Sequence, residues 1–263
     1  MQTMLGTASV RRLRHRKHRP RLRKVNRPSL PACILAQVIR MALMKPFRDR
    51  DDAARQLARA LAPWRGRDAV VYAIPRGAMP MAALIAKELD AELDVVLTHK
   101  LGAPGNPEYA IGAVAESGWS HVQYRGMDTD DAYVQRETAA QLARLHERRT
   151  RYGALRVPAK GRIAIIVDDG LATGATMIAA LHALRDQRPA RLICAVPVAA
   201  PDSLERVRPL ADDVVCLSAP PDFHAVGQYY DSFGQIEDEE VITTLNDARA
   251  KPPARKHRVP LSS

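Results

Sequence analysis

The stretch Arg162-Ile-Ala-Ile-Ile-Val-Asp-Asp-Gly-Leu-Ala-Thr-Gly-Ala-Thr-Met177 decides the fold of this chain. Its first part, Ile163 to Val167, is a short apolar and β-branched run, which predicts a buried strand. Two adjacent carboxylates, Asp168 and Asp169, follow at the carboxyl end of that strand, where ligands bind in an open α/β sheet. The stretch therefore predicts a strand with a ligand site at its end.

The loop after the two acids consists of small residues. Residues 170–176 include two glycines and two hydroxyls, and Met177 to Arg185 continues as an amphipathic helix. A strand, a small-residue loop and a helix start together point backbone N–H groups at an anion. The acids would repel an anion, but they suit sugar hydroxyls or a metal-bound polyol. The pattern thus indicates a site for a phosphate that is joined to a ribose.

These residues resemble the PRPP-binding signature of type I phosphoribosyltransferases, in which an apolar strand precedes two acids and a Thr/Gly/Thr loop. By that resemblance, Asp168 and Asp169 bind the ribose hydroxyls of PRPP. The loop that wraps the 5-phosphate would consist of Ala172, Thr173, Gly174, Ala175 and Thr176. The resemblance implies an α/β type I phosphoribosyltransferase fold, with a Rossmann-like parallel sheet flanked by helices and a small hood.

A second candidate loop, in Tyr72-Ala-Ile-Pro-Arg-Gly-Ala-Met-Pro80, follows an earlier predicted strand. Glycine lets the backbone approach a ligand, and an arginine brings a fork of donors suited to phosphate oxygens. Taken alone, Pro-Arg-Gly is also typical of an ordinary turn, but its place at another strand end favours a ligand loop. In the family this position is the pyrophosphate loop, which would comprise Pro75, Arg76, Gly77 and Ala78.

The stretch from His99 to Gly118 is rich in glycine and proline and predicts a long connection, which matches the family's mobile catalytic loop by position. Lys100 would neutralise the departing pyrophosphate, and Glu108 and Glu116 are the carboxylates of this stretch. Ala115-Glu-Ser-Gly118 is similar to the segment that carries a catalytic Glu in adenine phosphoribosyltransferases. Glu116 is therefore either a catalytic carboxylate or a solvated loop acid, and the sequence favours neither.

Ala172 departs from one branch of the family. Purine enzymes of the hypoxanthine type carry an Asp at this position, where it meets the base. The pattern Leu-Ala-Thr-Gly is closer to the adenine enzymes. Any group that handles a proton of the acceptor must then come from another part of the chain.

Residues 218–235 lack periodicity but are rich in aromatic residues. A flat base needs an apolar or aromatic face, and this segment follows the last predicted core strand. We expect it to form part of the hood, with Phe223 and Tyr229 or Tyr230 in contact with the acceptor. The alternative is that these rings fill a satellite core or a dimer contact.

Strand and helix patterns alternate along the chain, which predicts a parallel sheet covered on both faces. The expected strands are 69–74, 93–98, 121–124, 163–167, 192–198 and 213–217. The expected helices are 51–61, 79–89, 128–149, 177–185, 202–207 and 236–245.

The positive charge of the chain is confined to its first residues. The formal net charge is +11, and residues 1–43 hold nine Arg and two Lys with no acid, so residues 44–263 are neutral overall. We expect a basic disordered extension over 1–43, a phosphoribosyltransferase domain over 44–245 and a disordered tail over 246–263. The extension is a nucleic-acid-binding arm, a transit peptide or, the favoured interpretation, a mis-assigned upstream start.

The three cysteines lack metal-binding spacing, so we expect the protein to be located in a reducing cytoplasm. No apolar stretch is long enough to predict a membrane span. The resemblance implies transfer of phosphoribose from PRPP to a base-like acceptor, with release of pyrophosphate, as in nucleotide metabolism. It also implies Mg²⁺ bound through PRPP near Asp168 and Asp169, and a homodimer without membrane or nucleic-acid partners. The alternative is a PRPP-sensing regulator with little or no turnover.

Overall fold

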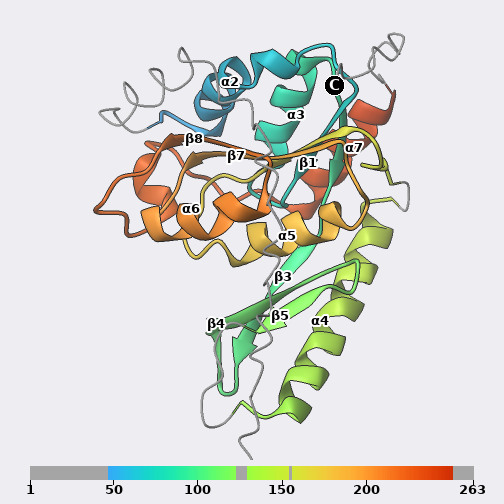
Figure 1. The fold of residues 1–263 in the computed structure, drawn as a ribbon, viewed down its shortest axis with the longest axis vertical. Helices are drawn as coiled ribbons and strands as arrows, with labels where there is room; N and C mark the ends of the chain where they lie inside the picture. Colours follow the sequence, from blue (N-terminus) through green and yellow to red (C-terminus); the bar gives the residue numbers. More distant parts are fainter. Residues whose placement is uncertain (1–46, 123–128, 154–155, 251–263) are drawn as a thin grey trace, which may run out of the picture. The chain divides into compact units, whose positions relative to one another are not determined.

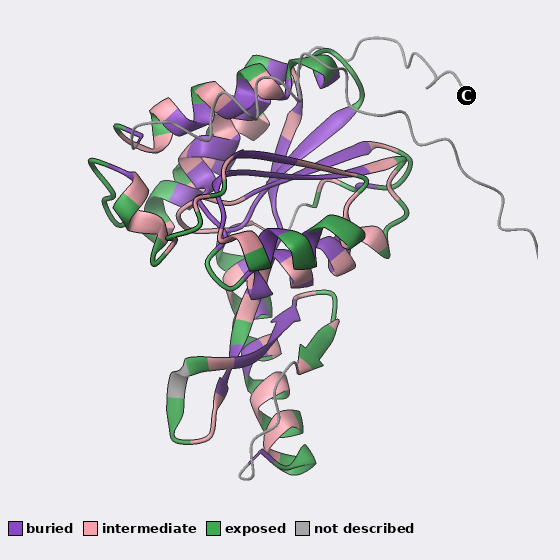
Figure 2. Ribbon diagram, turned by 60° about the vertical axis from the view of Figure 1, so that its left-hand side comes forward, coloured by how far each residue is buried: buried purple, intermediate pink, exposed green. Residues whose placement is uncertain are grey.

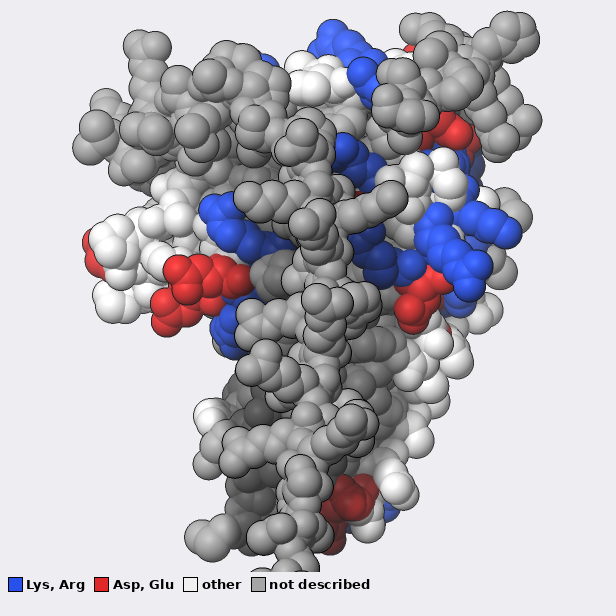
Figure 3. Space-filling view, viewed as in Figure 1, with Lys and Arg blue, Asp and Glu red and all other residues white. Residues whose placement is uncertain are grey.

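The structure is a computed structural model that describes residues 47–122, 129–153 and 156–250, without the side chains of Pro107 and Glu108 (Figure 1). The predicted extension over 1–43 and residues 251–263 of the predicted tail lie outside the described residues. In the described ranges, no helix combines the length and the apolar character needed to cross a membrane. On the face shown in Figure 3, the described basic and acidic side chains form small interspersed groups, as expected for a neutral domain.

The core is a five-stranded parallel sheet in the order β2-β1-β6-β7-β8. Its strands are β1 (Ala69–Ala73), β2 (Glu92–Val95), β6 (Ile163–Val167), β7 (Arg191–Val198) and β8 (Asp213–Ser218). The first strand pairs with β2 on one side and with β6 on the other. The strand order therefore reverses between β1 and β6, and in open α/β sheets such a switch point is where ligands bind.

Helices cover both faces of this sheet (Figure 1). One face carries α2 (Arg50–Ala60), α3 (Met79–Leu89) and α7 (Asp238–Ala250), and the other carries α5 (Ala175–Arg185) and α6 (Pro201–Val207). Short 3₁₀ helices span Ala62–Trp64, Arg208–Leu210 and Val226–Tyr229.

Successive side chains of the sheet enter two different cores, one on each face. Val71 and Ile165 belong to the first core, and Val70 and Ile166 belong to the second. Because both faces are buried, as Figure 2 shows, the central strands β1 and β6 consist of uninterrupted apolar residues rather than alternating ones.

The parallel-sheet prediction is confirmed for five of the six predicted strands, and most elements begin and end close to the predicted residues. The strand predicted over 121–124 lies instead at Ser120–Val122 in a separate antiparallel sheet. The strand Ile163–Val167 and the helix Met79–Leu89 have the predicted bounds. The last helix differs, because it runs to Ala250 and so includes residues 246–250, which the sequence assigned to a disordered tail.

The prediction of a long irregular connection over 99–118 is wrong. This stretch lies in β3 (Thr98–Ala103) and β4 (Asn106–Ala115), which form an antiparallel sheet with β5 (Ser120–Val122). The long helix α4 (Asp131–Arg151) packs against it.

Two features of the sequence explain this error. Pro104 and Gly105 make the turn between β3 and β4 rather than part of a loop. Gly112 allows a close approach between strands, because a Cβ there would lie 2.2 Å from the carbonyl oxygen of His121. Glycine and proline therefore serve a hairpin in this stretch, and their frequency alone does not reveal that.

Candidate functional site

Two loops meet at the switch point of the parallel sheet. Residues 75–78 follow β1, and residues 170–174 follow β6. The backbone of Gly77 touches the acid of the other loop, because a Cβ there would lie 2.2 Å from Asp169 Oδ2. The peptide bond between Pro75 and Arg76 is cis. The structure thus brings together the two loops that the sequence singled out, and only a glycine permits the contact.

Hydrogen bonds to α6 orient the loop that precedes α5. Ser203 Oγ donates to the carbonyl of Ala172 at 2.6 Å, and Arg206 donates to the carbonyl of Thr173 at 2.8 Å. In a trans peptide the carbonyl and the next N–H point in opposite directions. The N–H groups of Thr173 and Gly174 therefore point away from these α6 partners.

Gly174 completes the loop as the N-cap residue of α5, with φ at +72°. This left-handed conformation favours glycine, which has no Cβ to clash with the backbone. Residues 175 and 176 then form the first turn of an eleven-residue helix. Oriented N–H groups and the positive end of the helix dipole make this loop a suitable cradle for an anion.

The paired acids lie partly buried at the end of β6. Burial and the neighbouring charge of Asp169 raise the pKa of Asp168 well above its ordinary value, and the charges of Lys100 and Arg50 oppose that rise. Burial also raises the pKa of Asp169, although hydrogen bonds from Arg50 oppose the shift. A ligand that offers hydroxyl donors or a cation would relieve the repulsion between these two carboxylates.

Mg²⁺ fits this donor set if the ligand supplies most of the coordination. Asp168 and Asp169 offer the hard oxygen atoms that Mg²⁺ prefers. No group of three or more His, Cys, Asp and Glu side chains that could hold a metal ion occurs among the residues described. The site therefore suits an ion that shares two nearby carboxylates with phosphate oxygens and water, rather than one held by protein ligands alone.

A pocket of about 440 Å³ opens beside Asp169, and its size lies within the range of small-molecule sites. It joins the loop after β1 to the aromatic-rich segment near the end of the chain. The residues that line it are Arg50, Arg76, Gly77, Asp169, Val226, Phe233, Gly234, Gln235 and Ile236.

Residues 47–233 match the family described as the phosphoribosyl transferase domain. The chain belongs to this family. It is 42% identical over 233 residues to two Mycobacterium tuberculosis proteins, named "Putative phosphoribosyl transferase MT0597" in strain CDC 1551 and "Putative phosphoribosyl transferase Rv0571c" in strain H37Rv. These alignments cover 82% of this chain and 53% of each relative, so the chain spans about half the length of the curated relatives it matches.

The fold also resembles a solved structure, that of the protein TT1426 from Thermus thermophilus. The two are 45% identical with a TM-score of 0.66, and the match covers 78% of this chain and 99% of the other. The type I phosphoribosyltransferase fold predicted from the sequence is thereby confirmed.

Arg50 is a residue of this phosphoribosyl transferase domain that the sequence analysis missed. It is the first residue of α2, and its Nη2 atom lies 2.9 Å from Asp169 Oδ2. Asp49 precedes it and caps the helix by accepting a hydrogen bond from Asp52 N. Nothing in the local sequence separates Arg50 from the other basic residues of α2, so only the tertiary structure reveals its place.

The ring from segment 218–235 that lines the pocket is Phe233, which is 39% exposed. Tyr230 is buried instead, and its hydroxyl donates to the carbonyl of Asp169 at 2.7 Å. Phe223 and Tyr229 stack on each other with ring centres 5.4 Å apart and pack against the core. Acceptor binding by these three residues stays a prediction, and the placement of Tyr230 suits a support of the loop.

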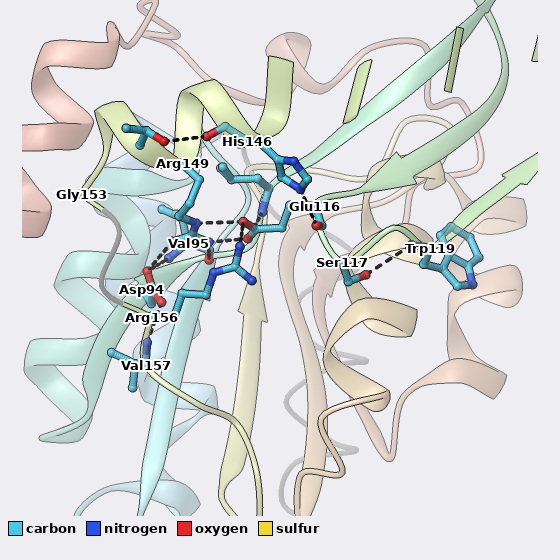
Figure 4. A network of polar contacts seen from close by, with 12 residues as sticks. Asp94, Val95, Glu116, Ser117, Trp119, His146, Arg149, Gly153, Arg156 and Val157 are labelled. Atoms are coloured by element: carbon cyan, nitrogen blue, oxygen red, sulfur yellow. Dashed lines mark hydrogen bonds and ion pairs between the residues drawn. The ribbon is translucent and has the colours of Figure 1, made fainter. Parts of the chain in front are cut away.

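Glu116 lies in a buried network with Arg149 (Figure 4). Arg149 donates two hydrogen bonds to Glu116, one to Asp94 Oδ1 at 3.1 Å and one to the carbonyl of Val95 at 2.7 Å. Arg156 donates a further bond to Glu116 at 3.1 Å. Burial opposes the charge of Arg149, but these carboxylates raise its pKa. Glu116 is thus not the solvated loop acid that the sequence allowed.

The other two catalytic candidates lie on the antiparallel sheet. Lys100 is an exposed residue of β3, and its positive charge opposes the rise in the pKa of Asp168. Glu108 belongs to β4, and its side chain lies outside the described structure. The position of Lys100 agrees with a role beside a phosphate ligand.

Proposed function

We propose that this domain binds PRPP across its two strand-end loops and transfers the phosphoribose group to a base-like acceptor, with release of pyrophosphate. The observation that carries the proposal is the contact between the loop at Gly77 and the acid Asp169 at the switch point of the sheet. In this proposal, the loop before α5, the paired acids and the loop with Arg76 take the phosphate, the ribose and the pyrophosphate of PRPP, respectively.

Each part of the site has a separate role in this proposal. The N–H groups of residues 172–176 hold the 5-phosphate at the start of α5. Asp168 and Asp169 accept hydrogen bonds from the ribose hydroxyls. Residues 75–78 bind the pyrophosphate, with Arg76 as its cation.

The reaction breaks the bond between ribose C1 and a pyrophosphate oxygen and forms a bond from C1 to an acceptor nitrogen. Positive charge grows on C1 and the ring oxygen, as in glycoside cleavage, while negative charge grows on the leaving group. Arg76 and Lys100 would stabilise that negative charge. Mg²⁺, when bound with PRPP, would supply further neutralisation of the pyrophosphate oxygens.

The acceptor would enter the pocket beside Asp169, where Val226, Phe233 and Ile236 provide apolar contacts. A flat ring gains both burial and stacking in such a place. The residue Ala172 carries no group that could exchange a proton with the acceptor. The pocket therefore suits an acceptor that needs no acid at that position.

Calorimetry with Mg-PRPP, followed by an assay of pyrophosphate release with a panel of nucleobases, tests the proposal. We expect binding of Mg-PRPP and release that depends on one class of base. Binding without release for every base would favour the PRPP-sensing regulator. No binding of Mg-PRPP would contradict both functions.

A further inference from the structure

The guanidinium of Arg50 connects the paired acids to the acceptor side of the pocket. Its Nε and Nη2 atoms donate to Asp169 Oδ2 at 3.1 and 2.9 Å. Its Nη1 atom donates to the carbonyl of Gly234 at 2.6 Å. The same group lies 3.8 Å from the centre of the Phe233 ring, within the range of a cation–π contact. One side chain therefore holds an acid at one edge and a stretch of chain at the other.

The acid edge of this connection is mostly buried. The side chain of Arg50 is 11% exposed and that of Asp169 is 16% exposed. Asp169 Oδ2 accepts both of these charge-assisted bonds, which together favour one orientation of the planar guanidinium. The backbone of Asp169 is fixed too, because its carbonyl accepts the hydroxyl of Tyr230.

The opposite edge is much less constrained. Residues 233–236, here called the acceptor wall, have no regular secondary structure, and 233–235 are exposed. Hydrogen bonds from Asp231 and Ser232 to the backbone of residues 47 and 48 hold the chain just before the wall. A Cβ at Gly234 would meet no atom within 4 Å. The Phe233 ring packs on Tyr230 with ring centres 4.9 Å apart, and Ile236 packs against the core. Between these two contacts, the bond from Arg50 restrains the backbone at Gly234.

We propose that Arg50 is a positioning residue that makes the order of the acceptor wall depend on ligand binding at Asp169. The inference rests on the proposed function, because it takes Asp169 as a ribose ligand. Ribose hydroxyls that bond to Asp169 fix its carboxylate, and the two hydrogen bonds to Oδ2 then fix the guanidinium. The Gly234 carbonyl and the Phe233 ring become fixed in turn, so the acceptor meets a wall that PRPP has ordered.

The coupling is reciprocal, since it is a free energy shared by two sites. An acceptor that packs on Phe233 would strengthen the binding of PRPP by the same factor. Arg50 would act only through its neighbours, and the proposal does not require it to touch the reacting atoms.

Hydrogen exchange of the full chain, measured by mass spectrometry with and without Mg-PRPP, tests this inference. In the unmodified protein we expect saturating Mg-PRPP to slow exchange in the peptide that covers 233–236. In Arg50→Gln we expect about ten-fold weaker PRPP binding, as for the loss of one charge-assisted hydrogen bond, and no slowing in this peptide at saturation.

Three further variants separate positioning from general damage. Arg55→Gln changes an arginine of the same helix whose pair with Asp51 is half exposed, so it should leave both affinity and exchange unchanged. Phe233→Leu keeps the Arg50–Asp169 contact and should lower the protection while PRPP affinity stays within about two-fold. Arg50→Lys keeps the positive charge but lacks the planar guanidinium with its several N–H donors. It replaces Arg50→Gln in the test if Arg50→Gln does not fold.

Two results would overturn the inference. One is PRPP binding by the unmodified protein without any slowing of exchange in 233–236. The other is an equal slowing in the unmodified protein, Arg50→Gln and Arg50→Lys. Failure of the unmodified protein to bind Mg-PRPP in calorimetry is a different result, which would remove the proposed function itself.

Discussion

Asp169 and Glu116 are both carboxylates held by an arginine, and they differ in what else surrounds them. Asp169 Oδ2 accepts from Arg50, and its carboxylate lines a pocket next to a second acid. Glu116 accepts from Arg149, from Arg156 and from the backbone N–H of Leu97.

The difference shows which of the two carboxylates is available to a ligand. Protein donors already saturate Glu116, whereas Asp169 lies beside a second acid: burial raises the pKa of both acids, and the charge of Asp169 raises that of Asp168 further. A group with unmet electrostatic demand in a pocket is a better candidate for function than one with a full set of partners. The surroundings of an acid therefore indicate its role more directly than its place in a motif.

The largest expected effect tests whether the Glu116 network is structural. Arg149→Met removes the buried cation of Asp94 and leaves Glu116 with the exposed Arg156, so we expect a loss of about 3–5 kcal/mol in the free energy of unfolding. Urea denaturation measures it. The matched control is Arg156→Met, which removes a 54% exposed arginine from the same carboxylate and should cost less than about 1 kcal/mol. A loss of less than about 1 kcal/mol in Arg149→Met as well would show that the network does not support the fold.

The second largest expected effect concerns the proposed phosphate loop, residues 172–176, which follows Asp169 in the sequence. Gly174→Glu places a carboxylate in the space proposed for the 5-phosphate, and we expect at least about 100-fold weaker binding of Mg-PRPP by calorimetry. Gly161→Glu is the control for backbone strain, because Gly161 also has a left-handed φ, +70°, and a Cβ there meets open space. Similar affinities of the two variants for Mg-PRPP would show that the 5-phosphate does not bind at this loop.

A third experiment separates the ribose role from phosphate binding. In the double variant Asp168→Asn and Asp169→Asn, we expect PRPP affinity to fall about 100-fold, as for two lost charge-assisted hydrogen bonds, while affinity for inorganic phosphate stays within about three-fold. Titration calorimetry with each ligand measures the two constants. Parallel losses for both ligands would contradict a ribose role for the acids.

The smallest expected effect follows from the raised pKa of Asp168. A carboxyl with a higher pKa in the folded state destabilises the fold once the pH rises above its ordinary pKa, because folding then favours the protonated form. Asp168→Asn removes this penalty, so we expect up to about 1 kcal/mol of added stability at neutral pH. The gain should vanish in acid, where Asp168 is protonated in both states. Denaturation at several pH values measures it, and a gain that persists in acid would point to another cause.

The local sequence pattern was sufficient to predict the structure where a single segment contains both a strand or helix and the side chains proposed to bind a ligand. The run Ile163–Val167, the acids after it and the helix that follows were all predictable, because strand burial and helix starts have short-range signals. The hairpin over 99–118 was not predictable in the same way. Its glycine and proline residues serve a turn and a close strand contact, which depend on the partner strand rather than on neighbours in sequence.

The sequence by itself determined the parallel sheet, the small-residue loop at Gly174 and the pairing of two acids at a strand end. These features follow from periodicity, residue size and charge within a few consecutive residues. Only the tertiary structure decided that Arg50 reaches Asp169 and that Arg149 encloses Glu116. The first contact spans 119 positions of the sequence, and the second spans 33 positions. Long flexible side chains find such partners through packing of distant elements, for which a single sequence carries no local signal.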